Sequence, residues 1–115
     1  MQIAQWLETR AEVSTVRFPA LPSSPDHDLY RQQFNGPSGL FSFSLHSDDP
    51  VAIAAMVDGM QLFAIGVSWG GYESLILPAD PRPIRTAKPW RDTGQLIRLS
   101  IGLEHPDDLI NDLKL

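Results

Sequence analysis

Prolines interrupt this chain at short intervals and confine regular structure to the segments between them. Pro19, Pro22 and Pro25 punctuate one loop, and a second proline-rich loop runs from residue 78 to about residue 90. Proline stops helices and central strands because it lacks the backbone N–H donor that both structures use. We therefore expect short helices and strands joined by loops.

Apolar residues between these loops recur with two different periods. Recurrence at every third or fourth residue predicts helices, whereas alternation and short β-branched runs predict strands. We expect helices near residues 3–11, 26–34, 50–59 and 106–113, and strands near residues 13–18, 40–45, 62–67, 75–77 and 96–101. In the second helix Asp26 is the expected cap, and Leu29, Tyr30 and Phe34 are expected to face inward.

The helices and strands interleave without strict strand–helix–strand regularity. This order favours an α+β fold, a two-layer sandwich in which a mostly antiparallel sheet is covered by helices. The chain has 115 residues, of which 43% are hydrophobic, enough for one compact domain over residues 1–115 and not for two. A complete enzyme built on a large cofactor-binding sheet needs more residues than this.

The balance of charges argues against several classes of partner. Nine Lys and Arg stand against 14 Asp and Glu, a net charge of −5, whereas binding a phosphate backbone needs clustered cations. The absence of cysteine rules out disulfides, thiolate zinc sites and cysteine nucleophiles. No apolar run approaches the roughly 20 residues of a membrane span, and no leader pattern opens the chain. We expect a soluble, cytoplasmic domain that binds neither nucleic acid nor a membrane.

The beginning of the chain lacks a helix-capping residue. Ile3 and Leu7 already recur at helical spacing, yet no Ser, Thr, Asp or Asn precedes them. Two explanations stay open: fraying at a chain terminus, or an element that precedes this helix in a longer protein.

One short motif matches the nucleophile elbow of serine hydrolases. Residues 66–70 have the pattern G-x-S-x-G around Ser68, and Asp80 or Asp92 followed by His105 completes the hydrolase order. An elbow leads into a helix, whereas the residues that follow this motif are strand-like and end at a proline. We therefore interpret the motif as coincidental and His105 as a capping or solvent-exposed residue.

Metal and paired-carboxylate chemistry are not favoured. His27, His46 and His105 have no second ligand three or four residues away, so capping or solvent-exposed histidines are the simpler interpretation. The acidic pairs at residues 48–49 and 107–108 fall where helices begin. Acidic side chains are stabilising there because they complement the helix dipole.

A locally basic stretch lies in the second proline-rich loop. It contains Arg82, Arg85, Lys88 and Arg91, with Trp90 among them. A solvated loop is the favoured interpretation, and binding of an anionic substrate or of a neighbouring acidic surface is the alternative.

Arg98 stands in the middle of an apolar strand. Alternation puts Ile97, Leu99 and Ile101 on one face and Arg98 with Ser100 on the other. The stem of such an arginine is held by its neighbours, and its planar fork suits the capture of a carboxylate by two hydrogen bonds. An arginine on the solvent face of the sheet is the alternative, which the pattern alone favours slightly.

Several motifs together resemble one family, the carboxyl-terminal domain of the Cys/Met-metabolism (trans-sulfuration) pyridoxal-phosphate enzymes. The similarity runs through almost the whole chain, and two motifs in order at the family's separation are specific. The matching segments are residues 6–7, 12–13, 19–22, 39–43, 68–75, 96–104 and 106–110. Within the family, the sequence Ser-Trp-Gly-Gly-Tyr-Glu-Ser is most similar to that of the bacterial cystathionine β-lyases.

The resemblance implies the small carboxyl-terminal domain of a fold-type I enzyme that acts on a sulfur-containing amino acid. Cystathionine β-lyases cleave a carbon–sulfur bond of cystathionine and give homocysteine, pyruvate and ammonia. In this family the arginine that matches Arg98 binds the substrate α-carboxylate, and the residues that match Ser68 and Trp69 line the same pocket. These three residues are therefore the expected substrate-binding residues.

The resemblance also implies parts that this chain does not contain. The family holds pyridoxal phosphate through a lysine and an acidic residue of a large amino-terminal domain, whereas the only lysines here are Lys88 and Lys114. We expect the isolated chain to bind no cofactor, to form no Schiff base with it and to lack lyase turnover. We also expect a homo-oligomer. The alternative is a free-standing, non-enzymatic α+β module that associates with itself through exposed apolar surface.

Overall fold

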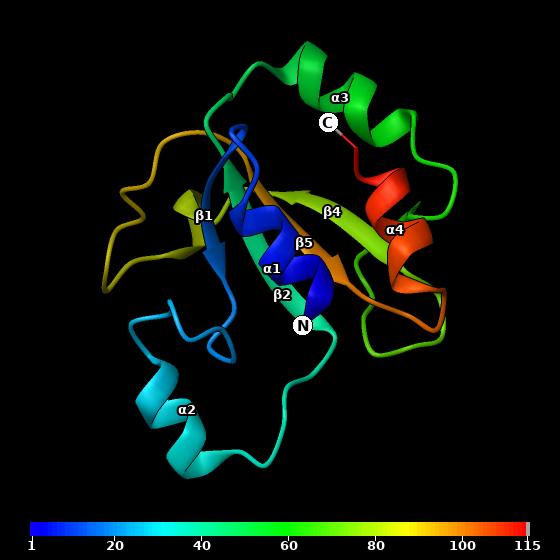
Figure 1. Cartoon of the computed structure of the whole chain (residues 1–115). Helices are drawn as coiled ribbons and strands as arrows, with labels where there is room; N and C mark the ends of the chain where they lie inside the picture. Colours follow the sequence, from blue (N-terminus) through cyan, green and yellow to red (C-terminus); the bar gives the residue numbers. More distant parts are fainter. Residues whose placement is uncertain (115) are drawn as a thin grey trace.

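The computed structural model describes residues 1–114 as a series of short helices and strands (Figure 1). The helices are α1 (Gln2–Glu8), α2 (His27–Gln33), α3 (Pro50–Asp58), the 3-10 helix η1 (Arg82–Ile84) and α4 (Pro106–Asp112). The strands are β1 (Val13–Arg17), β2 (Leu40–Leu45), β3 (Ala64–Ile65), β4 (Leu75–Ala79) and β5 (Leu96–Ser100). Each helix and strand expected from the apolar pattern is present, with some ends shifted.

The strands of the described chain form one sheet in the order β1-β2-β5-β4-β3. β1 with β2, β2 with β5 and β5 with β4 pair antiparallel, and the short edge strand β3 lies parallel to β4. The prediction of a mostly antiparallel sheet is confirmed. Because β5 lies at the centre of the sheet, its residues have cross-strand neighbours in β2 and in β4.

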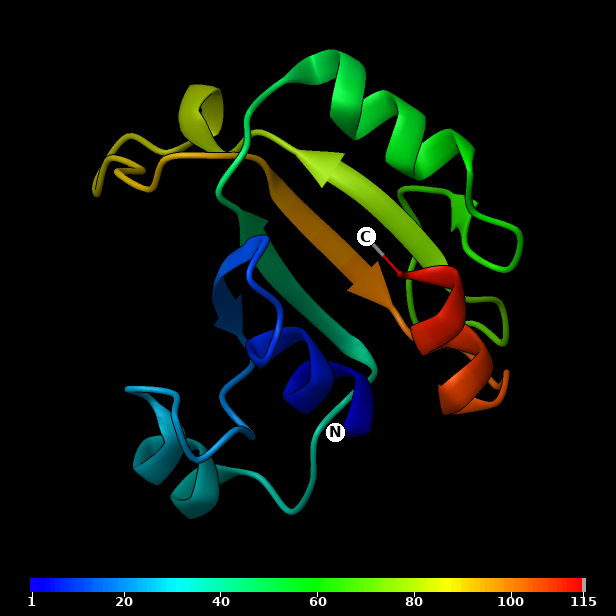
Figure 2. The same ribbon diagram turned by 45° about the horizontal axis from the view of Figure 1, so that its top comes forward.

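One face of the sheet is covered by α1, α3 and α4 (Figure 2). Phe43, Ile97 and Leu99 are fully buried on that face, because alternate residues of a strand point to the same side. The helical layer contributes Ile3, Ala4, Leu7, Ile53, Val57, Leu109 and Leu113 to the same core. Each large apolar side chain buried in this way stabilises the fold by about 1.5–3 kcal/mol relative to exposure. This arrangement confirms the predicted two-layer α+β class.

The opposite side of the sheet, named here the polar face, carries the polar and charged residues of the central strands. Cross-strand pairing places Arg17, Ser42, Arg98 and Leu77 in one row across β1, β2, β5 and β4. Neighbouring strands lie about 4.8 Å apart, so the Cα atoms of Arg17 and Arg98 are separated by roughly 10 Å. The two arginines therefore belong to the same face, two strands apart.

Two helices begin with the capping chemistry that the sequence predicts. The Asp49 carboxylate accepts a hydrogen bond from the Val51 N–H (3.0 Å) at the start of α3, where Pro50 is the first helical residue. At the start of α4, the Nδ1 atom of His105 accepts from the Asp107 N–H (3.3 Å). His105 is thus a capping residue.

Helix α2 differs from the prediction. Leu29 and Phe34 are 54% and 61% exposed and α2 has no buried residue, so the expectation that they face inward is wrong. Asp26 occupies the cap position without a side-chain hydrogen bond to the helix. Tyr30 packs against the edge of the core because α2 lies beside the sheet rather than over it (Figure 1).

Helix α1 is shorter than predicted. It ends at Glu8, and the Thr9 hydroxyl donates to the Trp6 carbonyl oxygen (2.7 Å) at that end. Ala11, expected on the apolar side of the helix, lies exposed in the turn that follows. The apolar spacing continues past the point where the backbone stops being helical.

The strand expected over residues 62–67 is reduced to Ala64 and Ile65, both of which are exposed. The backbone N–H groups of the three residues before it explain why the strand does not begin at residue 62. Those of Gln61, Leu62 and Phe63 all donate to the Asp112 carboxylate of α4, at 2.7 to 2.9 Å, instead of to a neighbouring strand.

Two absences hold for residues 1–114. None of the helices there has the length and apolar character needed to cross a membrane. No group of three or more histidine or carboxylate side chains is placed to hold a metal ion within that part of the chain.

Candidate functional site

Arg98 lies at the centre of the polar face. Ser42 of β2 and Leu77 of β4 flank it in the same row. The guanidinium Nη2 donates to three backbone carbonyl oxygens, those of residue 66 (3.2 Å), residue 67 (2.8 Å) and residue 68 (3.1 Å). The side chain therefore reaches across β4 and holds the backbone that follows β3.

The Nε group of Arg98 is left without a partner. It is buried and forms no hydrogen bond with any part of the described chain. An unpaired buried donor costs about 1–3 kcal/mol, and a guanidinium edge is the group that matches a carboxylate with two parallel hydrogen bonds. Nη2 is thus fixed by the protein, while the other N–H donors of the guanidinium form no hydrogen bond within the described chain.

Ser100 and Glu104, at alternate positions after Arg98, form hydrogen bonds with the same loop. The Ser100 hydroxyl accepts from the Gly70 N–H (3.1 Å), and the Glu104 carboxylate accepts from the N–H (3.1 Å) and the hydroxyl (2.7 Å) of Ser74. Ser74 is fully buried, and its hydroxyl accepts in turn from the N–H of residue 102 (2.9 Å). Residues 66–74, named here the β3–β4 loop, are therefore bonded to every second residue from 98 to 104.

Two glycines allow this close approach. A Cβ atom on Gly102 would overlap the carbonyl oxygen of Tyr72, and that oxygen accepts a hydrogen bond from the Leu103 N–H (2.9 Å). Gly70 has a φ of +80°, a conformation that other residues rarely adopt. The loop can turn and lie against the end of β5 because both positions lack a side chain.

Hydrogen bonds keep the Glu104 carboxylate in its charged form. Burial raises the pKa of Glu104, but hydrogen bonds from the Ser74 hydroxyl and from the backbone N–H groups of residues 74, 103 and 104 outweigh burial. The net pKa lies below the ordinary value of 4.5. At Asp112 burial also raises the pKa, and the three N–H groups of residues 61–63 lower it further than burial raises it. Each carboxylate anchors a loop in this way.

Ser68 and Trp69 lie where Arg98 holds the β3–β4 loop. Both residues are exposed, and Trp69 keeps 63% of its surface accessible. Arg98 binds the carbonyl oxygen of Ser68 and leaves its hydroxyl out of that contact. The structure thus brings the three predicted substrate-binding residues together, with two side chains projecting from a fixed backbone.

The hydrolase-like arrangement is not assembled. Asp80 and Asp92 each pair with an arginine, and His105 caps α4. The loop that contains Ser68 leads into β4 and not into a helix. The interpretation of this motif as coincidental agrees with the geometry.

The sequence did not predict the roles of Arg17 and Glu104. Arg17 donates to the Ser44 hydroxyl (2.9 Å) and pairs with Asp92, and burial lowers its pKa. Nothing in the sequence near Arg17 indicates this, because its partner lies in the distant proline-rich loop. For Glu104 the sequence does contain an indication, because Arg, Ser, Gly and Glu occupy every second position from residue 98 to residue 104.

The residues of this chain do not fit pyridoxal phosphate. Both lysines are exposed: Lys88 lies in the proline-rich loop, and Lys114 follows α4. The row that contains Arg98 is completed by Arg17, Ser42 and Leu77, none of which can form a Schiff base.

Known proteins share the sequence of this chain over almost its whole length. The family model described as Cys/Met metabolism PLP-dependent enzyme matches residues 1–115. The chain is 46% identical over 118 residues to cystathionine beta-lyase of Haemophilus influenzae, covering 99% of this chain and 30% of the relative. It is 44% identical over 115 residues to the L-alanine/L-glutamate racemase of Wolbachia pipientis, covering 98% of this chain and 28% of the relative.

A solved structure shows the same fold. Cystathionine gamma synthase from Xanthomonas oryzae pv. oryzae matches with a TM-score of 0.81 and 36% identity, covering 97% of this chain and 30% of that one. The chain thus spans 28–30% of the length of these relatives. Because the family model matches the full sequence, the chain belongs to the Cys/Met metabolism PLP-dependent enzymes.

Proposed function

We propose that residues 1–115 form one domain, the carboxyl-terminal substrate-recognition domain of a pyridoxal-phosphate-dependent carbon–sulfur lyase of the cystathionine β-lyase kind. The whole enzyme cleaves cystathionine to homocysteine, pyruvate and ammonia, acts in the cytoplasm and forms a homo-oligomer. The 46% identity to a relative of that name supports the subtype. The observation that carries the proposal is the Arg98 guanidinium, which the β3–β4 loop holds through Nη2 alone, beside Ser68 and Trp69.

Arg98 binds the substrate α-carboxylate. The oxygens of a carboxylate accept hydrogen bonds from guanidinium N–H groups that the β3–β4 loop does not bind, and the negative charge pairs with the guanidinium. Because three carbonyl oxygens hold Nη2, the guanidinium is oriented before the substrate arrives, which lowers the entropic cost of binding. The residues of this chain thus orient the substrate, while the cofactor is held by residues outside the chain.

Ser68 and Trp69 form a wall of the same pocket. Their backbone is fixed through the Arg98 guanidinium, so the two side chains keep a constant position relative to the bound carboxylate. The exposed indole of Trp69 offers apolar surface to the thioether chain of a sulfur-containing amino acid. The Ser68 hydroxyl offers both a donor and an acceptor.

A chimeric enzyme tests the proposal. This chain replaces the matching 30% of the Haemophilus influenzae relative, and the purified protein is supplied with pyridoxal phosphate and cystathionine. We expect pyruvate, the keto acid that β-elimination releases, and no activity from the Haemophilus part alone. Release of 2-oxobutyrate instead would show γ-elimination and contradict the subtype, and an inactive but folded chimera would contradict the proposal as a whole.

The isolated chain is expected to lack lyase activity, because neither of its lysines fits the cofactor. The measurement is pyruvate release from cystathionine by the purified chain with added pyridoxal phosphate. The expected rate equals that of free pyridoxal phosphate at the same concentration. Faster release that saturates with cystathionine would show that this chain works alone.

A second candidate is a free-standing, self-associating module without enzymatic activity. Four large side chains near the β3–β4 loop favour it, since Ile65, Val67, Trp69 and Tyr72 are 61–76% exposed. Light scattering of the purified chain separates the candidates. A dimer that Trp69→Ser dissociates supports self-association through this surface, and a strict monomer contradicts it.

A further inference from the structure

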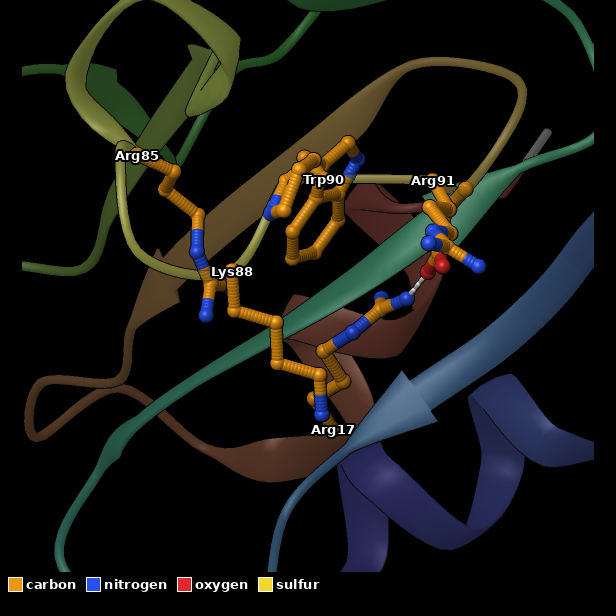
Figure 3. A pocket seen from close by; sticks show the side chains of 7 residues that line it. Arg17, Arg85, Lys88, Trp90 and Arg91 are labelled. Atoms are coloured by element: carbon orange, nitrogen blue, oxygen red, sulfur yellow. Dashed lines mark ion pairs between the residues drawn. The ribbon is translucent and has the colours of Figure 1, made fainter.

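Four cationic side chains converge on a pocket around Trp90, beside the polar face. Arg17 belongs to β1, whereas Arg85, Lys88 and Arg91 belong to the proline-rich loop that precedes β5. The pocket, named here the Trp90 pocket, has a volume of about 440 Å³ and is shown in Figure 3. Two segments that are distant in sequence thus bring positive charge to one hollow.

The indole ring of Trp90 organises these cations. The guanidinium carbons of Arg17 and Arg85 lie 4.6 Å and 5.6 Å from the ring centroid, within the range of cation–π attraction. In the view of Figure 3, Lys88 extends on the same side of the ring as Arg85, and Arg91 lies on the other side. The attraction to the ring offsets part of the repulsion between like charges.

The pocket holds more positive charge than its own carboxylate neutralises. Asp92 is the acidic residue that lines it, and it pairs with Arg17. Arg85, Lys88 and Arg91 form no ion pair with any residue in the described part of the chain. Four cations thus stand against one carboxylate, on a chain whose net charge is −5. A hollow with such local excess charge attracts a multivalent anion.

Arg82, in the same loop, already has a carboxylate partner. Its Nε and Nη2 donate to the Asp80 carboxylate at 2.7 and 2.9 Å. The hydrogen bond that Arg82 donates to Asp80 is the main cause of the raised pKa of Arg82. Arg82 does not line the Trp90 pocket. It therefore provides a matched control, an exposed arginine of the same loop whose charge is already paired.

We infer that the Trp90 pocket binds a small dianion of the phosphate class, either free phosphate or a phosphate monoester. One arginine such as Arg98 suffices for a single carboxylate, whereas the three cations that Asp92 leaves unpaired suit a group with two charges. Phosphate oxygens also accept hydrogen bonds from several directions, which suits guanidinium forks from β1 and from the loop. Arg98 does not line this pocket, so the inference goes beyond the proposed function and is tested independently of it.

Titration of the 15N-labelled chain tests the inference through the indole N–H resonance of Trp90. This resonance is assigned by its absence in Trp90→Phe, and those of Trp6 and Trp69 serve as internal references. Phosphate, glycerol phosphate and succinate are compared at about pH 7.5, where phosphate monoesters are dianionic. Sodium chloride keeps the ionic strength at about 0.15 M and supplies the monovalent reference. Phosphate or glycerol phosphate is expected to shift Trp90 saturably.

Two single variants of exposed arginines separate a built site from general charge. Arg85→Gln is expected to weaken the affinity for the phosphate compound about fivefold, the effect of losing one exposed ionic contact. Arg82→Gln removes the same charge from the same loop, and we expect it to change the affinity less than about twofold. Both side chains are exposed, so neither change disturbs the core.

Each outcome decides for or against the site. Saturation by phosphate alone identifies free phosphate as the ligand, and saturation by glycerol phosphate identifies a monoester. An affinity for succinate equal to that for phosphate overturns the phosphate class. A response that does not saturate, that chloride reproduces, or that Arg82→Gln reduces as much as Arg85→Gln overturns the inference. The cationic surface would then serve an acidic protein surface or solvent.

Discussion

Two loops on the polar face each hold an arginine, and they hold it in different ways. Arg98 is bound by three backbone carbonyls of the β3–β4 loop, which Ser100 and Glu104 fasten in turn. Arg17, in the same row of the sheet, is held by the Trp90 ring and the Asp92 carboxylate of the proline-rich loop. The carbonyl oxygens that bind Arg98 belong to the backbone, so a side-chain substitution does not remove them. The Trp90 ring and the Asp92 carboxylate can each be removed by a single substitution.

The β3–β4 loop sets the orientation of one guanidinium, whereas the proline-rich loop gathers positive charge around Trp90. The β3–β4 loop fixes one guanidinium through Nη2 and leaves its other N–H donors without partners in the described chain, as binding a carboxylate in one orientation requires. The Trp90 pocket collects several charges, three of them on exposed side chains that form no ion pair within the described chain. Substitutions that disturb the first loop are therefore expected to reduce stability, and those in the second to change anion affinity at little cost in stability.

The largest effect is expected from Gly102→Ala. The new Cβ overlaps the Tyr72 carbonyl oxygen and pushes the β3–β4 loop away from β5, a cost of about 3 kcal/mol in the free energy of unfolding. Denaturant unfolding measures it. Gly36→Ala is the control, because nothing lies within 4 Å of a Cβ at Gly36. Equal stability of the two variants would show that the loop does not press on β5.

Glu104→Gln is expected to have the next largest effect. The change removes the charge that the Ser74 N–H and hydroxyl both bind, and it lowers the free energy of unfolding by about 2 kcal/mol. Glu73→Gln, at the exposed neighbour of Ser74, is the matched control. A change below about 0.5 kcal/mol in Glu104→Gln would contradict the anchoring role of the carboxylate.

Acid is expected to weaken the same contacts. The pKa values of Glu104 and Asp112 both lie below their ordinary values of 4.5 and 3.8, so the unfolded chain takes up protons first as the pH falls. Their contribution is complete above the ordinary pKa values and is lost as the pH falls through the lower, folded ones. Urea midpoints at neutral pH and at about pH 3 should show this loss. A midpoint in Glu104→Gln that falls as steeply as in the parent would exclude Glu104 as a contributor.

Asp92→Asn is expected to have the smallest effect on stability. It breaks a partly exposed ion pair with Arg17 and changes the free energy of unfolding by about 0.5 kcal/mol or less. It also removes the carboxylate of the Trp90 pocket, so the affinity for phosphate should rise. A loss of stability as large as in Glu104→Gln would contradict the contrast between the two loops.

Local patterns predicted the parts of the fold that depend on neighbouring residues. Asp49 before Pro50 marked the start of α3, and alternation in β5 separated the core residues Ile97 and Leu99 from Arg98. Capping and alternation depend on residues a few positions apart, which the sequence displays directly. The location of Arg98 on the polar face therefore followed from the sequence.

Contacts between distant segments could not be predicted in this way. Phe34 lies one helical turn after Tyr30, but spacing does not reveal whether the chain supplies a surface to cover Phe34 or Leu29. The shortening of β3 depends on Asp112, which lies 49 residues further along the chain than Phe63. The same holds for Arg17, whose position over Trp90 results from the pairing of β1 with the sheet.

The central claim is that Arg98 binds the substrate carboxylate, and steady-state kinetics of the chimeric lyase test it most directly. Arg98→Gln is compared with Arg82→Gln, an exposed arginine already paired with Asp80. We expect Arg98→Gln to lower kcat/KM for cystathionine by about 100-fold or more, as the loss of one partner of a buried ion pair does. Arg82→Gln should stay within about twofold of the parent. A folded Arg98→Gln enzyme with an unchanged kcat/KM would contradict the account.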